Sequence, residues 1–124
     1  MKAFRHEAKL IAISGSLAGQ MFYCAQDTIS IGRDSANDIQ LKDSAISRYH
    51  CVIRRKADQS WVTDLDSKNG TLVNGEIITS PTLLTAGSWL EIGSHVFVLK
   101  LDETFDLISW TSSEERRLES RSLE

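Results

Sequence analysis

Residues 64–75 read Asp64-Leu65-Asp66-Ser67-Lys68-Asn69-Gly70-Thr71-Leu72-Val73-Asn74-Gly75. The second Asn-Gly pair lies between two apolar runs, because Leu72-Val73 precedes it and Ile77-Ile78 follows it closely. A two-residue hairpin turn of type I′ needs positive φ at both central residues, which Asn and Gly tolerate best. The stretch therefore predicts a polar loop that leads into a tight hairpin between Thr71–Val73 and Glu76–Ile78.

Short β-compatible runs alternate with turn-forming residues along the rest of the chain as well. Gly, Asn, Asp and Ser clusters separate runs that are rich in β-branched, aromatic and other apolar residues. No segment before residue 102 shows a sustained helical period of apolar residues. This density of strands predicts an all-β sandwich or barrel. The other expected strands are Lys9–Ile13, Met21–Ala25, Thr28–Ile31, His50–Arg54, Trp61–Leu65, Trp89–Ile92 and His95–Leu101.

Composition and charge narrow the class of protein. The 124 residues are 41% hydrophobic and 25% charged, which is typical of one soluble globular domain. The net charge is −3, whereas nucleic-acid binders are usually strongly basic, so no nucleic-acid partner is expected. No apolar run approaches the roughly 20 residues of a membrane span, and the N-terminus lacks the apolar stretch of a signal peptide. These features predict a cytoplasmic protein without a membrane partner.

The cysteine and histidine pattern predicts no metal and no cofactor. Cys24 and Cys51 are not in CxxC spacing, and the three histidines are scattered. Two buried thiols in a reducing compartment are the favoured interpretation. A disulfide and a metal site stay open as alternatives.

The C-terminal segment differs from the rest in charge and pattern. Residues 1–102 carry 11 basic and 11 acidic side chains, whereas residues 103–124 carry 3 and 6. We therefore expect one domain over residues 1–102 and a tail or linker over 103–124, which leads toward a second domain if the chain is part of a larger protein. A Ser/Thr-rich stretch before Glu114 and Glu115 is typical of a helix start, so the tail is expected to be partly helical.

Three polar motifs follow one another in the predicted β region. They are Gly32-Arg33, then Ser47-Arg48-Tyr49-His50, then the loop from Asp64 to Thr71 with Val73-Asn74-Gly75. In order and spacing, this set resembles the signature of the forkhead-associated (FHA) domain family. The resemblance covers roughly residues 8–101 and also includes Asn37-Asp38-Ile39, Gly87 and Ile92-Gly93.

The resemblance implies a β-sandwich of about eleven strands that binds phosphothreonine peptides through loops at one end. A phosphate group carries about −1.5 to −2 charges and three strong acceptor oxygens, so it needs charged donors held in place. Arg33 offers a bidentate fork, Ser47 a short hydroxyl donor, and Arg48 and Lys68 further positive charge. By resemblance, Asn69 binds the peptide backbone beside the phosphothreonine. The expected function is an adaptor that acts downstream of Ser/Thr kinases.

A second group of residues is expected to support the site. His50 is interpreted as a structural residue that ties the loops together by hydrogen bonds, and Thr71 as a brace for the loop that presents Asn69. The backbone positions expected to matter for loop geometry are Gly32, Gly70 and Asn74 with its Gly75 neighbour. In the family, the loop before Ser47 often reads the third residue after the phosphothreonine. Here Ala45 and Ile46 favour an apolar residue and Lys42 an acidic one, and the sequence leaves both open.

The same motifs have two alternative functions and one regulatory hypothesis. A phospho-independent interaction domain of the same fold is the main alternative, and the presence of both Arg33 and Ser47 argues against it. An enzyme is not expected, although Ser47, His50 and Asp66 can be combined on paper into a hydrolase triad, because no Gly-x-Ser-x-Gly elbow and no Gly-rich nucleotide loop occur. A regulatory hypothesis is that phosphorylated Thr104 or Thr111 in the tail binds the site.

Overall fold

The computed structural model of the chain describes residues 4–24 and 26–105, with side chains described between residues 8 and 101. Within this part the chain forms strands and turns, and no described segment is a helix that could cross a membrane. The eleven strands are β1 (Phe4–Ser14), β2 (Met21–Tyr23), β3 (Thr28–Gly32), β4 (Ile39–Gln40), β5 (Cys51–Lys56), β6 (Gln59–Asp64), β7 (Leu72–Val73), β8 (Glu76–Ile77), β9 (Thr82–Leu84), β10 (Trp89–Ile92) and β11 (His95–Phe105).

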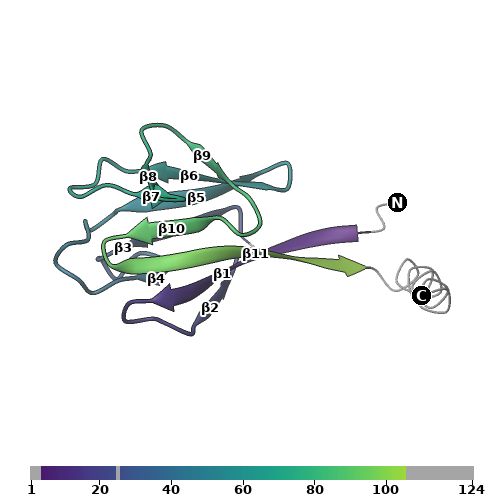
Figure 1. Ribbon diagram of the computed structural model, residues 1–124, viewed down its shortest axis with the longest axis horizontal. Coiled ribbons are helices and arrows are strands. Elements are labelled where there is room, and N and C mark those ends of the chain that lie inside the picture. The colour runs from purple at the N-terminus through teal and green to yellow at the C-terminus, as the bar shows by residue number, and fades with distance from the viewer. Residues whose placement is uncertain (1–3, 25, 106–124) are drawn as a thin grey trace.

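The strands form two sheets that face each other. One sheet has the order β2-β1-β11-β10-β7-β8, and the other has the order β4-β3-β5-β6-β9 (Figure 1). The pairing of β3 with β4 is parallel, whereas the neighbouring pairs β3–β5, β5–β6 and β6–β9 are antiparallel. The all-β sandwich of about eleven strands expected from the sequence is thereby confirmed.

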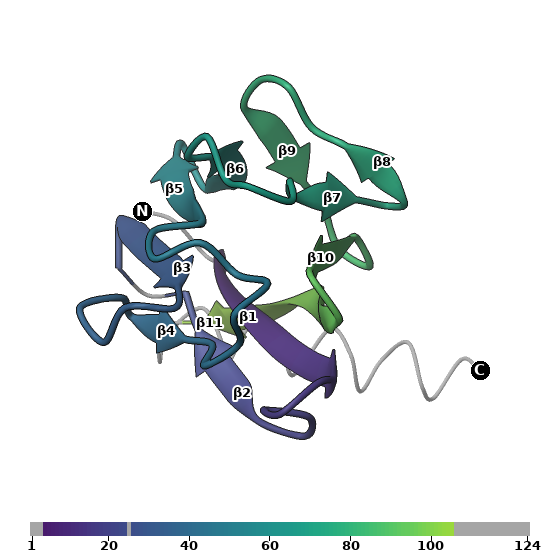
Figure 2. The ribbon, with the colours of Figure 1, turned by 90° about the vertical axis from the view of Figure 1, so that its left-hand side faces the viewer.

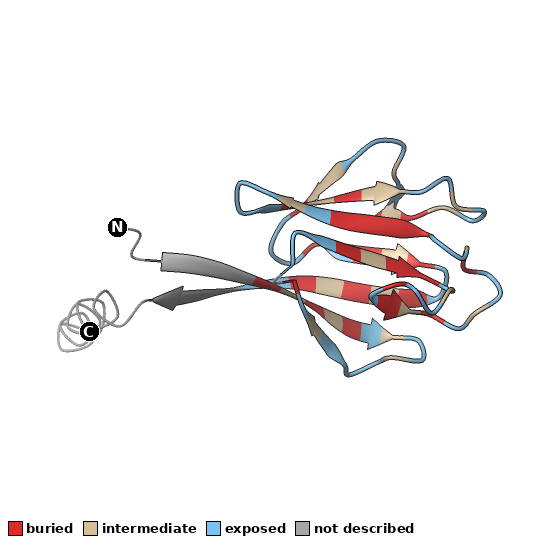
Figure 3. Ribbon diagram, turned by 180° about the vertical axis from the view of Figure 1, so that it is seen from behind, coloured by how far each residue is buried: buried red, intermediate tan, exposed pale blue. Residues whose placement is uncertain are grey.

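The core lies between the two sheets. Successive residues of a strand point to opposite faces, so every second side chain of the central strands reaches the interior. Leu10 of β1, Ile31 of β3 and Phe97 of β11 are completely buried, and burial of each such side chain stabilises the fold by about 1.5–3 kcal/mol. Buried residues accordingly concentrate on the central strands and exposed ones in the turns (Figure 3).

Nine strands lie where the sequence predicts them, with ends that differ by up to five residues. The sequence analysis missed β4 and β9. These strands are only two and three residues long, and so they carry too few residues for an alternating pattern to stand out.

Two hairpin turns have positive φ at both central residues, and only one of them was predicted from the sequence. Asn74 and Gly75 have φ values of 53° and 86°, which confirms the predicted type I′ hairpin between β7 and β8. The β5–β6 turn uses Ala57 and Asp58, whose φ values of 50° and 66° are also positive. The sequence did not predict this turn, because Ala rarely adopts such a conformation.

The two cysteines are free and buried, as the favoured interpretation predicted. Burial raises the pKa of the Cys24 thiol to about 11, although the Arg55 charge acts in the opposite direction. Burial raises the pKa of Cys51 to about 12. Both thiols are therefore protonated at neutral pH and poorly nucleophilic. No cluster of metal-ligating side chains occurs among the described residues.

The last strand continues beyond the domain boundary expected at residue 102. β11 ends at Phe105, and its final residues pair with the start of β1, with Thr104 opposite Arg5 and Phe105 opposite Phe4. One of the two proposed tail phosphorylation sites, Thr104, is therefore a strand residue. Thr111 and the expected helix start lie outside the described residues.

Candidate functional site

Three loops meet at one end of the sandwich: residues 33–38 between β3 and β4, 41–50 between β4 and β5, and 65–71 between β6 and β7 (Figure 2). They surround a cavity of about 500 Å³. We call it the loop cavity. Four of the five predicted phosphopeptide-binding residues line it, and Asn69 does not. The lining residues are Arg33, Ser44, Ala45, Ile46, Ser47, Arg48, Tyr49, Leu65 and Lys68.

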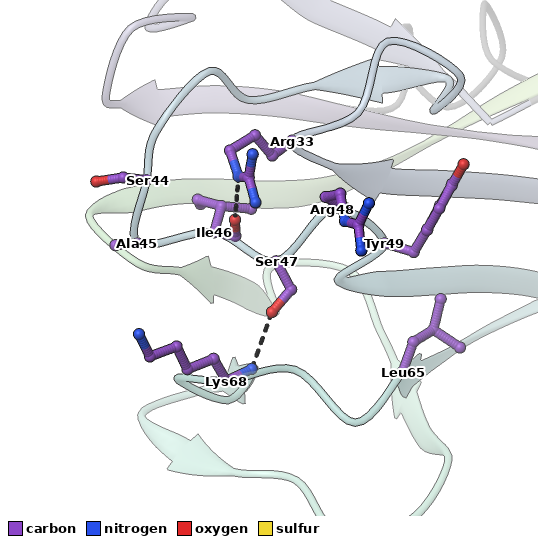
Figure 4. Close-up of a pocket in the computed structure, with 9 residues that line it drawn as sticks. All are labelled: Arg33, Ser44, Ala45, Ile46, Ser47, Arg48, Tyr49, Leu65 and Lys68. Atoms are coloured by element: carbon purple, nitrogen blue, oxygen red, sulfur yellow. Dashed lines mark hydrogen bonds between the residues drawn. The ribbon is translucent and has the colours of Figure 1, made fainter.

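Arg33 follows β3 directly and is fixed by the neighbouring loop. Its backbone N–H donates to the Ser47 carbonyl at 3.0 Å, and its Nε donates to the Ile46 carbonyl at 2.9 Å. The Nε contact orients the guanidinium group toward the cavity (Figure 4) and leaves its two terminal nitrogens for a ligand. An ion pair with Asp34 or Asp38 was the alternative role for Arg33.

Neither of those carboxylates is paired with Arg33. Asp34 accepts a hydrogen bond from the Ala36 N–H, and Asp38 accepts from the N–H and the hydroxyl of Ser30. Both carboxylates thus brace the backbone of this region. Because they are engaged elsewhere, the positive charge of Arg33 is directed at the cavity.

The hydroxyl of Ser47 lies between two loops. Its Oγ accepts a hydrogen bond of 2.9 Å from the backbone N–H of Lys68, 21 residues away (Figure 4). This contact is not the local turn bond considered as the alternative. Because a hydroxyl has one donor and two acceptor sites, acceptance from Lys68 leaves the Ser47 O–H available as a donor.

Arg48 and Lys68 add two exposed cations to the cavity wall. The Arg48 carbonyl accepts from the Asp34 N–H and from Asn37 Nδ2, which fixes its backbone. Among the described residues, neither side chain has a hydrogen bond or an ion pair. No Asp or Glu lines the cavity, so its three cations are not neutralised within it.

Asn69 connects the β6–β7 loop to the β4–β5 loop. Its Nδ2 donates to the Ala45 carbonyl at 2.8 Å, and the residue is exposed. This contact accounts for one of the two amide protons, so the second proton and Oδ1 stay available. Asn69 therefore holds the rim of the cavity in place and still presents a donor and an acceptor to solvent.

His50 holds the same two loops together from below. It is completely buried. The Ser47 N–H donates to Nδ1 at 3.1 Å, so the proton of the neutral ring is on Nε2, which donates to the Gly70 carbonyl at 2.8 Å. Both ring nitrogens are thus engaged with backbone groups, and neither contacts the Ser47 hydroxyl.

A carboxylate that the sequence analysis gave no role organises the β6–β7 loop. Asp64 accepts from the Ser67 hydroxyl and the Thr71 hydroxyl, each at 2.6 Å, and from the Ser67 N–H at 3.0 Å. Ser67 Oγ in turn accepts from the Gly70 N–H at 2.9 Å. Partial burial raises the pKa of Asp64, but the hydrogen bonds from Ser67 and Thr71 outweigh it and hold the pKa below 3.8. The three-residue spacing of Asp64 and Ser67 is typical of such a turn and could have indicated the role of Asp64.

Gly32 allows the β3 end and the β4–β5 loop to approach closely. A Cβ at this position would lie 2.2 Å from the Arg48 carbonyl oxygen and 2.8 Å from Asn37 Nδ2. Asn37, which is only 8% exposed, bridges the two segments by donating to the carbonyls of Asp34 and Arg48. A side chain at position 32 would therefore push Arg48 out of place.

The β4–β5 loop is anchored at a further point. Asp43 Oδ1 accepts from the Ala45 N–H, and Oδ2 lies 3.2 Å from His95 Nε2. The hydrogen bonds from Ala45 and His95 lower the pKa of Asp43. Ile46 is only 1% exposed and packs in the core, so Ser44 and Ala45 are the exposed cavity-lining residues that precede Ser47 in this loop.

Asn74 lies outside the loop cavity. Its N–H donates to the Trp89 carbonyl and its Oδ1 accepts from the Trp89 N–H, both at 2.9 Å. It therefore supports the β7–β8 hairpin. Tyr49 and Leu65, by contrast, line the cavity and are 51% and 39% exposed. The sequence analysis did not predict that Tyr49 and Leu65 line the cavity, because an apolar residue in a strand pattern is normally interpreted as buried.

The comparisons with known proteins agree with this geometry. The family model of the FHA domain matches residues 29–93, which include all three loops. The chain belongs to the FHA domain family. The resemblance inferred from the motifs is thereby confirmed.

The chain is similar to curated bacterial proteins and to solved structures. The chain is 41% identical over 91 residues to the oxoglutarate dehydrogenase inhibitor of Corynebacterium jeikeium, with 73% of this chain and 62% of that protein aligned. It spans less than two thirds of the length of this relative. Mycobacterium tuberculosis EmbR in complex with a low-affinity phosphopeptide superposes with a TM-score of 0.71 at 32% identity, over 76% of this chain and 24% of that one.

A structure from an analysis of phosphothreonine-dependent FHA domain interactions is also similar. Its TM-score is 0.70 at 26% identity, and the match covers 77% of this chain and 97% of that one. This match extends over nearly the whole of the other chain, so the two share the FHA fold along that length.

Proposed function

We propose that this FHA domain binds a phosphothreonine-containing segment of a partner protein in the loop cavity and acts as an adaptor downstream of a Ser/Thr kinase. The observation that carries the proposal is the charge of the cavity. Arg33, Arg48 and Lys68 line it without any carboxylate, and the cation side chains of Arg48 and Lys68 are unpaired among the described residues. A doubly charged phosphate is the ligand chemistry that such a cavity fits.

Each residue has a distinct role in the proposal. The terminal guanidinium nitrogens of Arg33 donate to two phosphate oxygens, and the Ser47 hydroxyl donates to a third. Arg48 and Lys68 add charge from either side of Ser47. Asn69 uses its remaining donor and acceptor on the peptide backbone. His50, Thr71, Gly32, Gly70 and Asn74 act only through the loops and turns that they hold.

We propose binding and not catalysis as the activity. In a hydrolase triad, a histidine nitrogen must accept the proton of the nucleophilic hydroxyl. Here His50 Nδ1 accepts from the Ser47 backbone N–H, and the Ser47 hydroxyl contacts Lys68 instead. His50 is therefore not placed to activate Ser47.

The partner and the context are part of the proposal. One relative is named an oxoglutarate dehydrogenase inhibitor, so we include regulation of a metabolic enzyme among the roles of the full protein. We place the protein in the cytoplasm, where its two buried thiols stay reduced. The phosphorylated tail, at Thr104 or Thr111, is a second candidate ligand, and mass spectrometry after kinase treatment that finds neither site modified would remove it.

Binding of a phosphothreonine peptide library and of its unphosphorylated twin tests the proposal. We expect wild-type protein to retain phosphothreonine peptides only. Arg33→Ala should abolish this retention, whereas Lys100→Ala, which removes an exposed charge from β11, should not change it. Equal retention of both libraries by wild type and Arg33→Ala would instead establish a phospho-independent interaction domain.

A further inference from the structure

A second cavity lies on the outer face of the sheet that contains β5, β6 and β9. Its volume is about 440 Å³, and Arg54, Lys56, Gln59, Trp61, Thr63 and Pro81 line it together with Ala57. We call it the β5–β6 pocket. It shares no lining residue with the loop cavity.

The strand register explains why these side chains share one face. Arg54 pairs with Trp61 and Lys56 pairs with Gln59. The preceding pair, Ile53 with Val62, is buried in the core, and Ser60 of the intervening pair is buried as well. Alternation along the two strands therefore sends the cations and the indole outward. Trp61 is only partly covered, so a large apolar ring remains accessible in a pocket that two cations also line.

The charge of this pocket is not balanced by the protein. Arg54 and Lys56 are exposed, and neither has a hydrogen bond or an ion pair with a described residue. The carboxylate of the adjacent turn, Asp58, pairs with Arg55 at 3.4 Å. No Asp or Glu lines the pocket. Two free cations beside an indole fit an acidic peptide segment that also carries an apolar side chain.

The pocket lies on the two strands that lead away from the loop cavity. Tyr49 and Leu65 line the loop cavity where β5 begins and β6 ends, and Thr63 lines the β5–β6 pocket only two residues before Leu65. Tyr49 precedes β5 by two residues, and an extended backbone from Tyr49 to Arg54 spans roughly 17 Å at about 3.3–3.4 Å per residue. An extended peptide covers this distance with about five residues.

We propose that the β5–β6 pocket binds an acidic segment of the same partner whose phosphothreonine occupies the loop cavity. This inference rests on the proposed function. The acidic residues lie about five to seven positions from the phosphothreonine, and the partner crosses Tyr49 and Leu65 on its way between the two cavities. The pocket thus adds selectivity among phosphothreonine sites according to the acidic residues at this distance.

Fluorescence polarisation with a matched peptide series tests the inference. The short peptide carries phosphothreonine with about three residues on either side. Two long peptides add an acidic cluster on the N-terminal or the C-terminal side, and each has a neutral twin. We expect one long acidic peptide to bind about three- to tenfold more tightly than its twin at low salt, because two exposed charge pairs and an indole contact contribute.

Charge reversal locates the effect. Arg54→Glu/Lys56→Glu should abolish the gain of the long acidic peptide and leave the affinity of the short peptide unchanged, whereas Lys100→Glu should alter neither. The indole N–H signal of Trp61, assigned with Trp61→Phe, should shift with the long acidic peptide and not with the short one. Equal affinity of both acidic peptides and their twins, or a gain that survives charge reversal, would overturn the inference. Failure of the short peptide to bind wild type would instead refute the proposed function.

Discussion

Replacement of Asp64 by Asn tests the claim that one carboxylate organises the β6–β7 loop. The carboxylate accepts three hydrogen bonds, two of them on Oδ1. An amide keeps a single acceptor oxygen, so Asp64→Asn loses at least one of these contacts, and the others lose their charge. A hydrogen bond to a charged group contributes about 1.5–3 kcal/mol, and solvent competes at this partly exposed position, so we expect a loss of about 2–3 kcal/mol in unfolding free energy.

Urea unfolding followed by tryptophan fluorescence measures this loss. Asp66→Asn is the matched control, because Asp66 lies in the same loop, is exposed, and has a positive φ of 57° that Asn tolerates. The control should unfold like wild type. Phosphothreonine-peptide affinity should fall in Asp64→Asn as well, because the same loop supplies the Lys68 N–H that orients Ser47.

The pH dependence of stability gives a second readout of the same carboxylate. The pKa of Asp64 in the folded protein lies below its ordinary value, so the folded state binds fewer protons there than the unfolded state. The stability that Asp64 contributes is present above pH about 4 and is lost as the pH falls. Asp64→Asn should weaken this acid sensitivity. If Asp64→Asn matches Asp66→Asn in both unfolding free energy and acid sensitivity, the carboxylate is not the centre of the loop.

Three further predictions follow from backbone geometry and burial. Gly32→Ala should lower phosphopeptide affinity at least tenfold in a titration, because its Cβ would meet the Arg48 carbonyl at 2.2 Å, and unchanged affinity would show that the loops move apart freely. Burial raises the pKa of Cys51 to about 12, so unfolding free energy should decline as pH rises from about 9, where the unfolded thiol ionises, and a Cys51→Ala variant should decline less; equal slopes would contradict this. Ala57-Asp58→Asn-Gly should raise the unfolding free energy by about 0.5–1 kcal/mol and the urea midpoint with it, because both positions have positive φ, and a lower midpoint would contradict the turn geometry.

The sequence predicted those parts of the fold that depend on local chemistry. The Asn74-Gly75 turn was predictable because few other residue pairs adopt two positive φ angles in succession. The Ala57-Asp58 turn was not, because the tertiary pairing of β5 and β6 imposes a conformation that Ala does not prefer. The short strands β4 and β9 were not predicted, because their extended conformation depends on pairing with β3 and β6 and not on their own few residues.

The motifs predicted which residues come together at the candidate site, but they did not predict the contacts that these residues make. The motifs identified Arg33, Ser47 and Lys68, and all three line the same cavity. The hydrogen bond from Asn69 Nδ2 to the Ala45 carbonyl joins residues 24 positions apart, and no local sequence pattern predicts such a contact. The burial of Ile46 was not predicted either, because a loop has no alternating pattern that would indicate which side chains point inward.

Calorimetric titration of one peptide in its phosphothreonine and unphosphorylated forms tests the central claim most directly. The phosphate should make two or more charge-assisted hydrogen bonds worth about 1.5–3 kcal/mol each, so removal of the phosphate should weaken binding at least about 100-fold. Ser47→Ala should reduce the difference between the two forms, because it removes one donor. Equal affinity for both forms would contradict the account, because the loop cavity would then not be a phosphate site.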